Sequence, residues 1–164
     1  MPDLELTRSR DDRRLYELAG IGTLRLEGFM SRRGTAEAGT AAWSFERVGF
    51  WRTTIRALDA GGAIAGMFDP RTIARGGTLT WSGRELALRP ASMWKDRYAL
   101  ADGDRELAVL DGRSWGRRPV TVTVDDGRAV DPGLLLFAAY VVRSLAEDSA
   151  STAGGAAAST AATG

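Results

Sequence analysis

The chain has 164 residues, of which 44% are hydrophobic and 26% are charged, as is typical of one globular domain. The 22 basic and 21 acidic residues leave a net charge of +1, so the composition gives no overall attraction to nucleic acid, and we expect no nucleic-acid partner. Cysteine and histidine are both absent, which excludes disulfides, thiolate nucleophiles, Ser-His-Asp triads and most transition-metal sites. We therefore expect a protein that is not an enzyme and holds no cofactor or metal.

The N-terminal segment is charged and polar through Arg14 and lacks the apolar run of a signal peptide. No stretch reaches the roughly 18 apolar residues of a membrane span. We expect a cytoplasmic location and, more specifically, a protein that contacts a membrane peripherally. The first dozen residues are expected to form a loose lead-in, and residues 31–40 an exposed loop.

Short segments of alternating polarity follow in chain order. Leu24 and Leu26 alternate with charged residues, and Trp43 and Phe45 alternate with Ser44 and Glu46. Gly49 interrupts this pattern and predicts a bulge. Further segments with a period of two cover residues 51–57, 85–89 and 120–125. This period is typical of half-buried antiparallel strands.

Turn-forming sequences lie between these segments. They are residues 59–62, Gly76-Gly77, Ser82-Gly83, Asp102-Gly103, Asp111-Gly112 and Asp126-Gly127. Such residues supply the backbone angles of tight hairpins. Their spacing predicts eight or more antiparallel strands between residues 20 and 125, arranged as a meander or barrel.

One helix is expected near the C-terminus. Asp131 is a good N-cap, Pro132 suits the first helical position, and residues 134–142 form an unbroken apolar run. A helix from residue 134 to 146 is roughly 20 Å long, too short for a hydrocarbon core of about 30 Å. A helix that is apolar all round must then be surrounded by protein.

The predicted domain covers residues 1–148, with its central helix at about 132–148. Residues 149–164 are all Ala, Gly, Ser or Thr and are expected to be a disordered tail.

The order of these features resembles the LURP-one-related and phospholipid scramblase-like group, which shares the tubby C-terminal fold. The resemblance covers about residues 20–148. It rests on residues 43–46 and 59–62, Leu79-Thr-Trp81 with Gly83, residues 97–100 with Asp102-Gly103, and the apolar segment 134–142. It implies a mostly β fold, an antiparallel closed or nearly closed β-barrel that encloses one apolar C-terminal helix.

The same resemblance implies a non-enzymatic binding or scaffold module that contacts anionic lipid headgroups or a protein partner, since tubby domains bind phosphoinositides through surface Lys and Arg. No counterpart of the scramblase calcium segment is found, and no lipid-binding residue of the family is transferred to this chain. The alternative is an intracellular small-molecule carrier of lipocalin-like architecture, with the helix packed outside an open barrel. The two differ in whether the helix fills the barrel.

Candidate surface residues come from uneven charge, because residues 71–118 are net basic and residues 119–148 net acidic. A basic rim would attract phosphate groups, whereas an ordinary solvated surface would not.

Trp94 and Trp115 lie in loop-like sequence beside basic residues; local packing is the simpler interpretation and an interfacial contact the alternative. The candidate anion- or lipid-facing residues are Arg71, Arg75, Arg113, Trp115, Arg117 and Arg118.

Overall fold

The computed structural model describes residues 3–27, 32–49, 54–72, 75–113, 116–125 and 129–161, with helix side chains described up to residue 152. The strands are β1 (Asp3–Arg8), β2 (Leu15–Leu18), β3 (Gly22–Glu27), β4 (Arg33–Ala38), β5 (Ala41–Val48), β6 (Thr54–Asp59), β7 (Ile64–Pro70), β8 (Gly77–Trp81), β9 (Arg84–Pro90), β10 (Arg97–Asp102), β11 (Arg105–Gly112) and β12 (Val120–Val124). One helix follows, α1 (Pro132–Ala161).

These strands form one closed antiparallel barrel in which each strand pairs with its neighbours in the chain. The barrel closes where β1 pairs with β12, with Leu6 opposite Val120 and both side chains fully buried. Closure leaves no strand edge open along this seam, and an exposed edge is a liability for aggregation. The predicted fold class is thereby confirmed.

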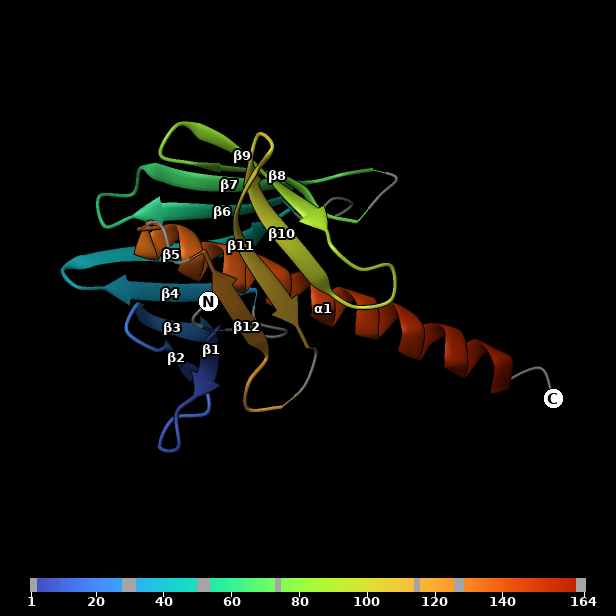
Figure 1. Cartoon of the computed structure of the whole chain (residues 1–164). Coiled ribbons are helices and arrows are strands. Elements are labelled where there is room, and N and C mark those ends of the chain that lie inside the picture. The colour runs from blue at the N-terminus through green and yellow to red at the C-terminus, as the bar shows by residue number, and fades with distance from the viewer. Residues whose placement is uncertain are drawn as a thin grey trace.

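The first part of α1 lies inside the barrel, with strands on every side (Figure 1). Every residue from 133 to 142 is buried, which agrees with the unbroken apolar run. The Phe137 ring lies 5.2 Å from the ring of Phe45 on β5 and 5.6 Å from Trp81 on β8. The interior is thus packed side chain against side chain, unlike the open barrel with an external helix that the lipocalin-like alternative required.

Glycines in the barrel wall and in α1 provide the space for this packing. A Cβ atom at Gly112 on β11 would lie 2.8 Å from Val142 Cγ1. At Gly133 it would lie 2.6 Å from ring atoms of both Trp43 and Trp81. Because carbon atoms in contact are normally about 3.5–4.0 Å apart, neither position accepts a side chain without movement.

Two segments expected to be irregular are strands, and both corrections have a physical reason. The lead-in contains β1, which is needed to pair with β12 and close the barrel. The expected loop at residues 31–40 contains β4, whose buried positions are Gly34 and Ala36. A Cβ atom at Gly34 would lie 3.3 Å from Tyr140 Cε2, so small residues fit here and the usual large apolar signal of a strand is missing.

The prediction at Gly49 is also corrected. β5 ends at Val48, and Gly49 follows it with a φ of 101°, so it lies past the strand end and not in a bulge. The irregularities in strand register lie elsewhere, at Ala57/Leu58 and Leu100/Ala101. The expected strand start at residues 51–53 lies outside the described residues.

The start of α1 agrees with the sequence prediction, and its end lies further along the chain than predicted. At its start, Asp131 Oδ1 accepts hydrogen bonds from the backbone N–H groups of Gly133 and Leu134, as expected of an N-cap. At its other end, α1 does not stop at Asp148 but continues to Ala161, into the segment for which disorder was expected. Alanine is the best helix former, and extending an existing helix avoids the cost of nucleation.

Of the described helices, none is both long enough and apolar enough to span a bilayer.

Replacing Gly133 with Ala tests the fit between α1 and the barrel. Alanine is favoured over glycine in helices by up to about 1 kcal/mol. The contact with two tryptophan rings should outweigh that gain, because overpacking costs about 1–3 kcal/mol. We expect Gly133→Ala to lower the free energy of unfolding by about 1–2 kcal/mol in urea titration. Ser151→Ala, at an exposed helix position, is the control and should leave stability equal or slightly higher. A Gly133→Ala protein as stable as the wild type would contradict this packing.

Candidate functional site

Hairpin connectivity decides which loops share an end of the barrel. Because consecutive strands are antiparallel, the loops that follow β1, β3, β5, β7, β9 and β11 all lie at one end. α1 begins at the opposite end, after β12, and leaves the barrel among these loops (Figure 1). We call this end the exit face and define it by the described residues of these loops, which are 9–14, 32, 49, 71–72, 75–76, 91–96, 113 and 116–119. The opposite end, where Asp131 caps α1, is called the cap end.

The exit face is strongly basic in its described loop residues. Its acids there are Asp11, Asp12 and Asp96. Asp12 pairs with Arg25 at 2.6 Å, and hydrogen bonds from the Arg14 backbone N–H and from Arg25 lower the pKa of Asp12. The cations are Arg10, Arg13, Arg14, Arg32, Arg71, Arg75, Lys95, Arg113, Arg117 and Arg118. One face of a nearly neutral molecule thus carries a large local excess of positive charge.

The cap end has the opposite character. In its described loop residues the charged side chains are Asp104, Asp125 and Asp131. The cations beside these loops, Arg84 and Arg105, are the first residues of β9 and β11, and Arg84 is paired with Asp102. The near-zero net charge of the whole chain hides this separation. A barrel that is positive at one end and negative at the other orients in an electric field from a charged surface.

An exposed apolar pair lies on the exit face. Met93 and Trp94, in the loop between β9 and β10, are 88% and 93% exposed. Ser92 shapes this turn, since its Oγ accepts hydrogen bonds from the backbone N–H groups of Trp94 and Lys95. The interpretation of Trp94 as locally packed is therefore wrong: the turn directs the indole away from the barrel. Large apolar side chains exposed to water beside a lysine are typical of a contact surface.

Arg75 holds that loop in place. Its guanidinium donates to the backbone oxygen of Lys95 at 2.9 Å and of Ser92 at 3.3 Å, and it pairs with Asp96 at 2.7 Å. It also lies 5.4 Å from the ring centre of Tyr98, whose pKa is raised by burial. Arg75 is therefore a structural residue of the exit face and not a free anion-binding cation.

Asp96 connects the loop to the rest of the face. Its carboxylate accepts from Arg75 and from the hydroxyl of Ser149 on α1, at 3.2 Å. Its backbone oxygen accepts from the backbone N–H of Gly112, at the end of β11. One residue thus joins the loops after β7, β9 and β11 to the emerging helix.

Two ion pairs lie where α1 leaves the barrel, one between β5 and the helix and one within the helix. Arg47 on β5, with a side chain only 9% exposed, pairs with Asp148 at 2.6 Å. Arg143 pairs with Glu147 one helical turn later at 3.1 Å and lies 5.2 Å from the ring centre of Tyr16. Burial raises the pKa of Glu147, while Arg143 and Arg47 oppose that rise. These contacts fix the direction in which the helix emerges.

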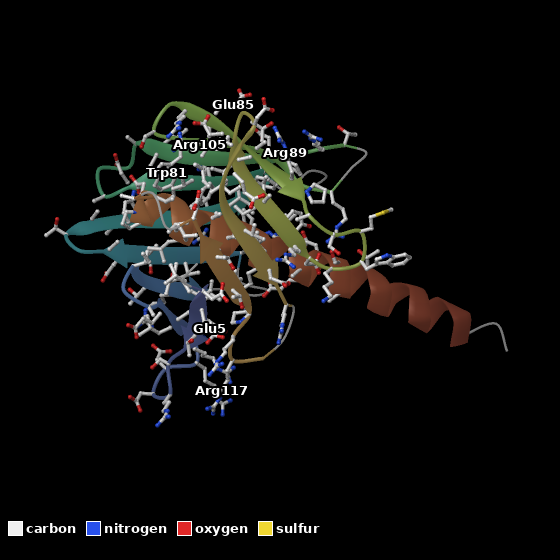
Figure 2. All side chains as sticks on the ribbon, viewed as in Figure 1. Glu5, Trp81, Glu85, Arg89, Arg105 and Arg117 are labelled. Carbon is white, nitrogen blue, oxygen red and sulfur yellow. The ribbon has the colours of Figure 1, made fainter. Side chains whose placement is uncertain are left out.

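The predicted surface residues fall into two groups on this face. Arg71 and Arg75 lie by α1, where they line a cavity of about 290 Å³ together with Asp148 and Ser149. Arg117 and Arg118 lie beside β1, since Arg8 N donates to Arg117 O and Arg118 pairs with Glu5 at 3.2 Å (Figure 2).

Arg113 is exposed at the end of β11, and the predicted Trp115 lies outside the described residues. The structure therefore brings the predicted arginines to one end but not into one cluster. Sequence reasoning missed Arg10, Arg13, Arg14 and Arg32 on the same face. Counting β1, β2 and β4 as strands would have placed these arginines on the exit face, because the loops after odd-numbered strands all lie at that end.

In comparisons with known proteins, no family model, no curated protein and no solved structure matched this chain. The described residues contain no group of three or more acidic side chains placed to hold a metal ion.

Paired substitutions separate the structural arginine from an exposed one. Arg75→Gln removes the bonds that hold the loop after β9, and we expect it to lower the free energy of unfolding by about 1–2 kcal/mol, since the group is about one-third exposed. Arg71→Gln removes the same charge at an exposed position and should change stability by less than about 0.5 kcal/mol. Urea titration of both variants makes the comparison. Equal effects would contradict the role assigned to Arg75.

Proposed function

We propose that this protein is a non-enzymatic binding module of the LURP-one-related and scramblase-like type that docks on anionic membrane surfaces through its exit face. The observation that carries the proposal is the separation of charge between the two ends of the barrel, with the exposed Met93 and Trp94 at the positive end.

Electrostatics supply the attraction and the orientation. A basic residue near an anionic bilayer contributes on the order of 1 kcal/mol, and the effect acts within a Debye length of roughly 10 Å at 0.1 M salt. Arg10, Arg13, Arg71, Arg113 and Arg117 are all exposed on this face. With the acidic cap end turned away, only one orientation places these charges near the lipid.

The apolar pair supplies a shallow anchor. Tryptophan is favoured at the headgroup level of a bilayer, where its ring is apolar and its N–H remains near water. Trp94 and Met93 project from the exit face at the tip of a hairpin, and the adjacent Lys95 can keep its ammonium among headgroup phosphates. Arg75 and Asp96 brace the base of this loop, which reduces the entropy lost on docking.

A small-molecule carrier of lipocalin type is less well supported. Such a carrier holds its ligand in the barrel interior, whereas here the interior contains the buried side chains of α1. The exit face, in contrast, needs no internal cavity to act as a docking surface.

Vesicle co-sedimentation tests the proposal with variants of equal total charge. Arg113→Gln/Arg117→Gln removes two charges from the exit face, and Arg84→Gln/Arg105→Gln removes two from the cap-end hairpins. On phosphatidylserine-containing vesicles at low salt, the first pair should weaken binding by about tenfold to thirtyfold, given about 1 kcal/mol per charge. The second pair should bind like the wild type. Trp94→Ala should also weaken binding, and with less dependence on salt.

Two outcomes of this experiment would contradict the proposal. No sedimentation of the wild type with anionic vesicles at low salt would overturn the proposal. Equal losses in both double variants would show that total charge and not the exit face controls the association.

A further inference from the structure

A cavity lined by described residues lies at the cap end, away from the exit face. It has a volume of about 530 Å³, within the range of about 300–1,000 Å³ typical of small-molecule sites. It lies where the hairpin of β8 and β9 and the start of β11 meet the segment that leads into α1. Trp81 and Arg105, which both line it, are labelled near this end of the barrel in Figure 2.

The inner wall of the cavity is apolar. It consists of Trp81, Leu86, Leu107 and Leu134, each at least nine-tenths buried and each from a different element. The side chain of Val130 adds to this surface from the segment before α1. A ligand that enters would place its own apolar surface against these side chains and gain free energy because that surface leaves water.

The rim of the cavity carries one available cation. Arg84 is paired with Asp102, and Asp131 is occupied in capping α1 through its Oδ1. The guanidinium of Arg105 has no ion-pair or hydrogen-bond partner among the described residues. A guanidinium at the mouth of an apolar cavity is suited to a carboxylate, which it can bind through two parallel hydrogen bonds.

We propose that the cap-end cavity binds a small amphipathic organic acid, with its apolar body against Leu86, Leu107 and Leu134 and its carboxylate at Arg105. The site is separate from the exit face and goes beyond the proposed membrane contact. Each function can therefore fail without the other.

Calorimetric titration with octanoate and with octan-1-ol tests this inference, because the two probes share a chain and differ in charge. The wild type should bind octanoate at least about tenfold more tightly than octan-1-ol. Arg105→Gln should remove most of that difference and leave the binding of octan-1-ol unchanged. Arg97→Gln, which removes an exposed arginine at the start of β10 and outside both proposed sites, is the control and should bind both probes like the wild type.

A second variant tests the cavity independently of charge. Ala129 is exposed on the cavity lining, so Ala129→Trp should fill the mouth without disturbing the core and should abolish binding of both probes. The inference is overturned if the wild type binds neither probe, if Arg105→Gln retains the full preference for octanoate, or if Ala129→Trp binds as well as the wild type.

Discussion

A closed barrel that encloses an apolar helix gives this molecule one shared core and sets the positions of its loops. Residues 133–142 of α1 are buried on all sides, so neither the helix nor the barrel has a complete core without the other. The barrel wall has a glycine where a large helix side chain comes close: Gly34 lies against Tyr140, and Gly112 lies against Val142. Because interiors are close-packed, these fits determine the depth and the rotation of α1.

The enclosed helix also makes the two ends of the barrel different. A helix that starts at one end of the barrel must leave at the other, and antiparallel hairpins sort the remaining loops between these two ends. Basic loops gather around the emerging helix, where Arg47 and Asp148 join the helix to the wall and Asp96 joins it to the neighbouring loops. Acidic loop residues remain at the start of the helix. The proposed docking face and the proposed acid-binding cavity thus occupy opposite ends of one packed core.

Much of this fold could be predicted from sequence, because an all-round apolar helix too short for a membrane has few alternatives to enclosure. β4 could not be predicted, since its inward positions are Gly34 and Ala36 and lack the usual apolar signal. That omission, with the missed β1, also hid the charge separation, because the end to which a loop belongs depends on the number of strands before it. The exposure of Trp94 could not be predicted, because it depends on a turn formed by the Ser92 hydroxyl. The cap-end cavity could not be predicted either, because segments far apart in the chain form it.

Native-state hydrogen exchange distinguishes a core shared by helix and barrel from a barrel that is stable alone, because it compares the backbone amides of α1 with those of the strands around it. If helix and barrel form one core, amides from residue 135 to 146 should exchange only through global unfolding, with the same opening free energy as amides in β11. Amides beyond residue 149, where the described side chains are exposed, should exchange through local fraying. Rapid exchange at 135–146 while β11 remains protected would show that the barrel holds together without its helix, and would contradict this account.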